Sequence, residues 1–184
     1  MNDNMKKVAL NYGLLTGSVG VLYFLASYII DESLFVNPIG SVSVIIITLV
    51  LPFFSIRAYK KLNNGFATFQ EAFSAYILPV ILSIFIGFVF NLFMYNVVDS
   101  DLATRQGEMA FESMMEMPEQ RLQATIGFMG IDSINELEEK IIKDARENVT
   151  LVGQLKISAM GFVFFALIGL IAGAVGKKNP PEFD

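Results

Sequence analysis

The sequence predicts an all-α integral membrane protein: a bundle of four transmembrane helices, of which helices 3 and 4 extend into an extracytoplasmic helical hairpin. Four apolar stretches without Asp, Glu, Lys or Arg are the main observation, and they cover residues 8–30, 34–56, 72–98 and 157–175. A helix needs roughly 20 residues to cross a hydrocarbon core about 30 Å thick, so each stretch is a candidate span. The hydrophobic fraction of 54% and the mean hydropathy of +0.55 also favour a membrane protein.

One membrane domain, residues 1–184, is expected, with residues 99–156 as its hairpin insertion. Cys and His are both absent, which removes thiol nucleophiles, thiolate metal sites and imidazole bases. We therefore expect no catalytic residue, cofactor or metal site, and a protein that is not an enzyme. The net charge of -5 gives no reason to expect nucleic acid as a partner.

The first apolar stretch follows two lysines and runs for 23 residues. It is longer than the apolar core of a signal peptide, about 7 to 15 residues, so we expect it to remain as a span. Basic residues also lie next to two other span ends, and the full set is Lys6, Lys7, Arg57, Lys60, Lys61, Lys177 and Lys178. By the positive-inside rule, both termini are cytoplasmic and residues 99–156 lie outside.

The connector after the second span carries a helix-start signal. Thr68 and Glu71 have the spacing of a capping box, in which the Thr hydroxyl and the Glu carboxylate each accept a backbone N–H. We expect Glu71 to be such a cap. The alternative is a contact for a proton or a substrate at the inner boundary of the third span.

Two residues interrupt the apolar pattern of the third span. Pro79 removes a helical hydrogen bond and is expected to kink the helix. Asn91 is costly facing lipid, so we expect it to point into the bundle and to bond across helices. Broken helices also occur in transporters, but packing is the simpler explanation of one proline.

Glycines at helical spacing mark candidate packing faces in the first and fourth spans: Gly13, Gly17 and Gly20, and Gly169, Gly173 and Gly176. We expect spans one and four to pack closely together. The contact belongs either within one chain or between two chains of a homo-oligomer.

The outer segment is patterned as a helical hairpin. An amphipathic stripe that ends at Pro118 predicts that the third span continues outward as a helix, through Val98, Leu102, Met109, Ala110, Met114 and Met117. On the return side, Ser133 and Glu136 form a second capping box, and the pattern from residue 133 to residue 175 predicts one unbroken helix. The hairpin is expected to stand outside the membrane.

The hairpin tip, residues 123–131, is unusually apolar for a solvent-facing connection. Phe128, Met129 and Ile131 either fold back and fill the top of the hairpin or form an exposed patch for a partner or the membrane surface. Two nearby patterns are weak: four methionines between residues 109 and 117 do not converge on one helix face, and Asp99-Ser100-Asp101 lacks the rest of a calcium loop.

Three segments carry a family resemblance: KKVALNYG (6–13), IRAYK (56–60) and GFATFQEAF (65–73). With the glycine-rich last span and its terminal lysines, they resemble the domain of unknown function 4199 family. The resemblance implies a bacterial multi-pass inner-membrane protein whose outer hairpin lies in the periplasm. It implies no reaction and no catalytic residues.

The function expected from the sequence is that of a non-enzymatic scaffold or accessory subunit. It lies in the lipid bilayer, and its periplasmic hairpin contacts a membrane or periplasmic protein. The alternative is a small channel or transporter assembled as a homo-oligomer, with Asn91, Pro79 and the two glycine faces lining the path.

Overall fold

The computed structural model describes residues 2–131 and 133–180, and the elements named within them are all helical. The helices are α1 (Asp3–Ile29), α2 (Pro38–Leu62), α3 (Phe69–Phe93), α4 (Leu102–Met115), α5 (Glu119–Met129), α6 (Ile134–Asn148) and α7 (Leu151–Gly176). A short 3₁₀ helix, η1 (Glu32–Phe35), precedes α2, and a π-helical turn, η2 (Met94–Val98), ends α3.

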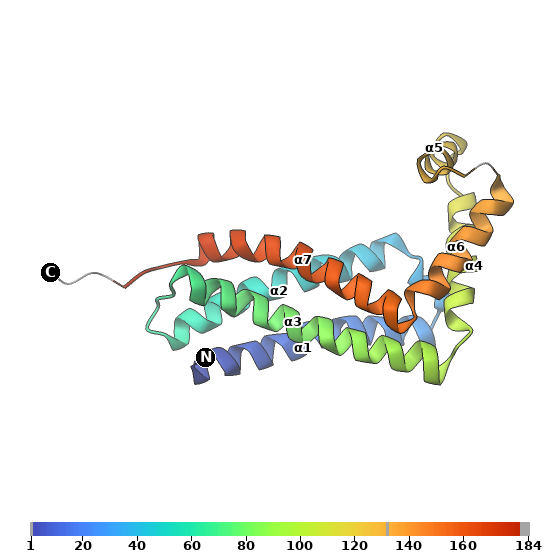
Figure 1. Cartoon of the computed structure of the whole chain (residues 1–184). Coiled ribbons are helices and arrows are strands. Elements are labelled where there is room, and N and C mark those ends of the chain that lie inside the picture. The colour runs from blue at the N-terminus through green and yellow to red at the C-terminus, as the bar shows by residue number, and fades with distance from the viewer. Residues whose placement is uncertain (1, 132, 181–184) are drawn as a thin grey trace.

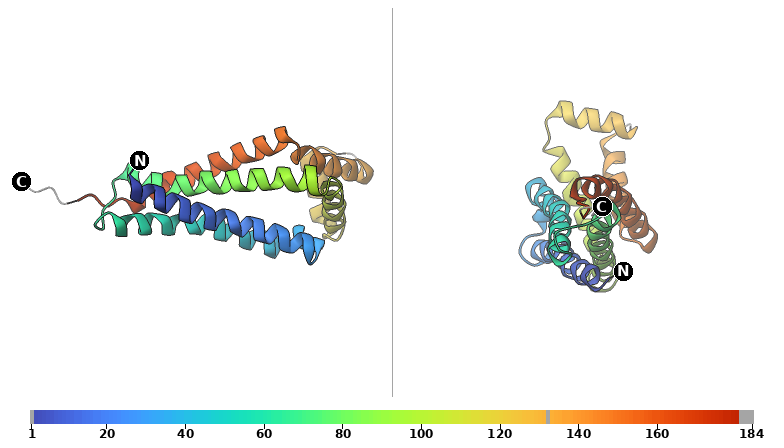
Figure 2. Two further views of the ribbon diagram at one scale, coloured as in Figure 1. Left: turned by 90° about the horizontal axis from the view of Figure 1, so that it is seen from below. Right: turned by 90° about the vertical axis from the view of Figure 1, so that its left-hand side faces the viewer.

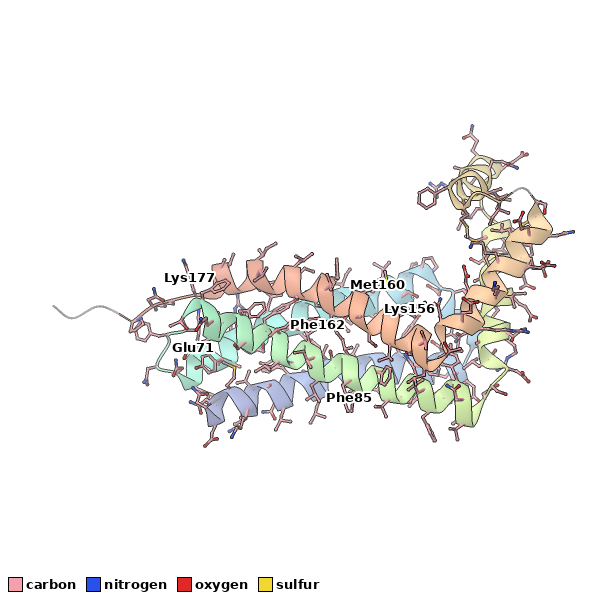
Figure 3. The ribbon with its side chains drawn as sticks, in the orientation of Figure 1. Glu71, Phe85, Lys156, Met160, Phe162 and Lys177 are labelled. Atoms are coloured by element: carbon pink, nitrogen blue, oxygen red, sulfur yellow. The ribbon has the colours of Figure 1, made fainter. Side chains whose placement is uncertain are left out.

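Four of these segments are long and apolar enough to cross a membrane: Asp3–Ile29, Pro38–Leu62, Phe69–Val98 and Leu151–Gly176. The chain is thus an all-helical, membrane-embedded protein with four candidate spans, as the sequence predicted. Apolar side chains cover the outside of the bundle, and Phe85 and Met160 are 61% and 73% exposed (Figure 3). Such a surface suits contact with lipid tails.

The second span begins later than the apolar stretch indicated. The stretch starts at residue 34, but residues 32–35 form η1, and α2 starts at Pro38. The Asn37 side chain accepts the N–H groups of Ile39 and Gly40 at 2.9 and 3.1 Å, so a polar cap sets the helix start.

Helix α3 lies at the centre of the bundle, between α1 and α7, and it also packs on α2 (Figures 1 and 2). The glycines of α1 therefore face α3. A Cβ atom at Gly13 would lie 2.7 Å from Leu82, and one at Gly17 would lie 2.8 Å from Ile86. Gly20 has no such neighbour within 4 Å.

The glycines of α7 face the other side of α3. Gly169 lies against the ring of Tyr76 and Gly173 against Phe73, while Gly176 approaches α2. Spans one and four therefore do not pack closely within one chain, and their contact between two chains of a homo-oligomer stays a prediction. Small residues identify a close contact, but their spacing does not identify the partner helix.

Helix α3 continues through the buried Pro79. Because proline has no N–H, the carbonyl group of Ala75 loses its helical donor. The Ser55 hydroxyl of α2 donates a hydrogen bond to this carbonyl oxygen. Pro79 thus contributes to the packing of α3 against α2.

The third span does not continue outward as a helix. The chain leaves the helical conformation at Asp99, whose φ and ψ are -150° and 94°. One carboxylate oxygen of Asp99 accepts the N–H groups of Asp101 and Leu102 at 3.2 and 3.1 Å, so a new helix, α4, begins there.

The return side is also two helices, so the prediction of one rod from residue 133 to residue 175 is wrong. Helix α6 ends at Asn148, and the Thr150 hydroxyl accepts the N–H of Gly153 at 3.1 Å to start α7. A Cβ atom at Gly153 would lie 2.1 Å from the Glu147 carbonyl oxygen. Glycine therefore permits the sharp turn between the two helices.

The outer arm, defined as residues 102–131 and 133–148, consists of α4, α5 and α6. Helices α4 and α6 pair closely, and a Cβ atom at Gly107 would lie 2.9 Å from Ile142 Cα. The arm points sideways from the end of the bundle opposite the termini, and α5 lies at the far end of the arm (Figures 1 and 2). It extends across the bundle axis, whereas the sequence predicted a hairpin that stands along it.

Candidate functional site

The outer arm is tied to the bundle by Arg105 of α4, which pairs with two carboxylates. Its guanidinium donates to both oxygens of Glu32 in η1, at 2.7 and 3.0 Å. It also donates to both oxygens of Asp99, at 2.8 and 3.3 Å. The Tyr28 hydroxyl donates to Asp99 from α1 at 3.3 Å. The Arg105 side chain of α4 therefore joins η1 to the connection between α3 and α4.

The charges of this cluster stabilise one another. Hydrogen bonds from Arg105 hold the pKa values of Glu32 and Asp99 below their ordinary values. The two carboxylates in turn raise the pKa of Arg105, Glu32 more than Asp99. The three side chains are between 19% and 38% exposed, so water weakens the attraction. Glu32, Asp99 and Arg105 are therefore all ionised at neutral pH.

Apolar residues pack beneath this cluster at the junction of arm and bundle. Leu102, at the start of α4, is fully buried and packs with Phe24 and Met94. The Phe24 ring contacts the rings of Phe35 and Tyr95 edge to face, with centroids 5.0 and 5.5 Å apart. The base of the arm is therefore held by both burial and charge.

The arm has a small core at its far end. Leu122, Ile131 and Leu137 are buried there, and Met129 packs against them. Residues 119–129 form α5, so most of the tip that the sequence predicted as a connection is helical. Gly130 follows α5 with a φ of 65°. Glycine adopts this left-handed conformation readily.

The three tip residues divide between the two alternatives left open by the sequence. Ile131 is 6% exposed and fills the tip, whereas Phe128 is 93% exposed. Met129 is half-buried. At the start of α6, Ser133 accepts the N–H of Glu136 at 3.2 Å, which confirms the expected helix start.

The predicted capping box at the start of α3 is present. Glu71 accepts the N–H of Thr68 at 2.8 Å, and the Thr68 hydroxyl accepts the N–H of Glu71 at 3.3 Å. The Tyr59 hydroxyl donates to the second Glu71 oxygen at 2.7 Å, and Asn2 donates to Tyr59 at 3.1 Å. Both carboxylate oxygens thus have donors, as expected of a structural cap.

A cavity of about 320 Å³ lies within the bundle, and residues of α1, α2, α3 and α7 line it. The side chain of Thr16 is buried, and its hydroxyl makes no hydrogen bond to any residue that the structure describes. Asn91 is half-buried and lines the same cavity, which agrees with the predicted inward position. Among the described residues, its side chain makes no hydrogen bond to another helix.

Within residues 2–131 and 133–180, no three His, Cys, Asp or Glu side chains are arranged to hold a metal ion. Asp99 of the Asp-x-Asp pattern pairs with Arg105. The Arg105 cluster itself had no sequence signal, because Arg105 and Glu32 are 73 positions apart.

The comparisons with known proteins give one match. The model of a family described as "Protein of unknown function (DUF4199)" matches residues 11–178. The comparisons with curated proteins and with solved structures found no match.

Proposed function

This chain belongs to the DUF4199 family, whose description states no activity, and from its outer arm we propose that it is a non-enzymatic membrane scaffold or accessory subunit. In this proposal, the arm docks a second protein beside the membrane. The exposure of Phe128 is the observation that carries it.

An aromatic side chain that is 93% exposed is unusual in an arm that buries its other large apolar residues at least in part. Aromatic residues contribute strongly to protein interfaces when a partner pocket encloses them. Acidic residues outnumber basic ones by twelve to six between residues 99 and 156. The partner therefore has an apolar pocket with a basic rim.

The anchoring of the arm supports this role. Arg105 and the buried Leu102 hold the base of α4 on the bundle, so α5 keeps its position relative to the spans. A preorganised surface loses less conformational entropy when a partner binds. In this proposal the arm lies in the periplasm of a bacterium, the spans lie in the inner membrane, and both termini lie in the cytoplasm. The basic residues beside the span ends support this orientation.

The proposal is tested by affinity purification of the tagged full-length protein from cross-linked native membranes. Phe128→Ser removes the exposed ring and is expected to lose the partner while the protein accumulates normally. Met115→Ser is the matched control, because Met115 also lies in the arm and is 40% exposed. Recovery of the same partner with Phe128→Ser contradicts the proposal.

The cavity within the bundle favours a second candidate function, a small oligomeric channel or transporter. The Thr16 hydroxyl, which has no hydrogen-bond partner among the described residues, and the Asn91 amide are polar groups inside a membrane protein. Such groups often line a path. Solute flux into liposomes that contain the protein tests this candidate. Flux that Thr16→Val or Asn91→Leu abolishes supports it, and a monomer without flux excludes it.

A further inference from the structure

A groove of about 510 Å³ lies between α2 and α7 at the end of the bundle that holds the termini (Figure 1). Its walls are apolar and open outward: Val50 and Phe53 of α2 are 43% and 41% exposed, and Val175 of α7 is 81% exposed. Two cations, Arg57 and Lys60, also line the groove. The outer arm lies at the opposite end of the bundle.

The cations of the groove lack acidic partners among the described residues. The Arg57 guanidinium lies 5.7 Å from the centroid of the Phe54 ring. Lys60 Nζ donates to the Gly176 carbonyl oxygen at 3.0 Å, which uses one of its three donors. No carboxylate of the described chain lies within 4.0 Å of either cation. Both charges are thus available to an anion.

Further basic residues lie at this end. Lys177 and Lys178 follow α7, and Figure 3 shows Lys177 at the same end of the bundle as Glu71. The segment after α7 is fixed there, because Ala67 and Lys178 exchange two backbone hydrogen bonds of 2.9 and 2.7 Å. These cations favour a positive electrostatic potential beside the groove.

We propose that this groove binds one anionic phospholipid. The phosphate group binds Arg57 and Lys60, and an acyl chain lies along Val50 and Phe53. Val50 precedes Arg57 by seven residues, which places it about 10 Å deeper in the membrane along the helix. This depth matches an anionic headgroup at the interface with its chain in the hydrocarbon core. Arginine binds phosphate through two parallel hydrogen bonds, and basic pockets between spans bind anionic lipids.

The experiment measures thermal unfolding of the purified full-length protein in neutral detergent during titration with phosphatidylglycerol or phosphatidylcholine. Phosphatidylglycerol is expected to raise the unfolding midpoint well above the effect of phosphatidylcholine. Arg57→Gln/Lys60→Gln is expected to weaken phosphatidylglycerol binding roughly 30-fold, because each cation near an anionic lipid contributes a factor of about five. Arg57→Gln alone is expected to weaken it about fivefold and leaves the bond from Lys60 to Gly176 intact.

The matched control is Lys7→Gln/Lys61→Gln, which removes two exposed cations at the same end that do not line the groove. Full retention of the phosphatidylglycerol response in this control, with its loss in the Arg57 variants, supports the site. An equal response to both lipids overturns the proposal. Retention of the response by Arg57→Gln/Lys60→Gln, or an equal response to inorganic phosphate, also overturns it.

Discussion

Arg105 of α4 donates two hydrogen bonds to the carboxylate of Glu32, so the base of the outer arm is tied to the turn between the first two spans. The same guanidinium binds Asp99 at the break between α3 and α4. This cluster fixes the direction of the arm, because it joins both sides of the junction from which the arm leaves the bundle.

Replacing Arg105 by Gln is expected to loosen the arm without unfolding the spans. Hydrogen bonds between charged groups contribute more than neutral ones, and partial exposure reduces this, so we expect a loss of about 1–2 kcal/mol. Hydrogen exchange in α4 is then about 5- to 30-fold faster, while α3 is unchanged. Lys143→Gln is the control, because its pair with Glu147 is 3.8 Å long and exposed. Equal exchange in both variants contradicts this account.

The same cluster predicts a pH dependence. The pKa values of Glu32 and Asp99 lie below their ordinary values of 4.5 and 3.8. Stabilisation by a carboxylate with a lowered pKa is complete above the ordinary value and is lost as pH falls through the lowered one. The difference in unfolding midpoint between wild type and Arg105→Gln is therefore expected to be constant at neutral pH and to shrink below about pH 4. A midpoint difference that grows on acidification would contradict a stabilising role for the Glu32 and Asp99 carboxylates.

Ser55→Ala is expected to destabilise the bundle by about 1–3 kcal/mol, because it leaves the buried Ala75 carbonyl without a donor. Pro79→Ala in the same chain restores the missing backbone N–H and is expected to recover part of this loss. Thermal unfolding of the single and double variants measures the coupling. Ser83→Ala is the control, because Ser83 donates only to Val80 of its own helix. If the effects of Ser55→Ala and Pro79→Ala on the free energy of unfolding simply add, the Ser55 hydroxyl does not replace the N–H that Pro79 lacks.

Gly13→Val is expected to separate α1 from α3. The Cβ of valine would lie 2.7 Å from Leu82, and overpacking of this kind costs about 1–3 kcal/mol. Gly20→Val is the matched control on the same helix, because no neighbouring helix has an atom within 4 Å of its added Cβ. Thermal unfolding in detergent compares the two variants. Equal midpoints show that α1 and α3 are not in the described contact.

The spans and the caps were predictable from the sequence because both depend on local chemistry. Apolar length identifies a span, and Thr68 with Glu71 identifies a helix start. The helix breaks before α4 and before α7 also had local signals. Asp99 lies at the first break, and Thr150 and Gly153 lie at the second. Continuous amphipathic patterning concealed them.

Contacts between distant residues were not predictable. The glycines marked close packing but gave no partner, and the pattern of α1 and α7 is equally compatible with α3 or with each other. The pair between Arg105 and Glu32 joins two polar connections, and composition gives no reason to connect them. The exposure of Phe128 beside the buried Ile131 likewise depends on how α5 folds onto α6.

The most direct test of the docking role places a photoreactive amino acid at Phe128 and, as a control, at Glu139, which is exposed on α6 of the same arm. Each full-length variant is irradiated in native membranes and its adducts are identified. The account predicts one discrete protein adduct at position 128 that is absent at position 139. Adducts only with lipid or only with other copies of this chain at position 128, or the same adduct at both positions, would contradict it.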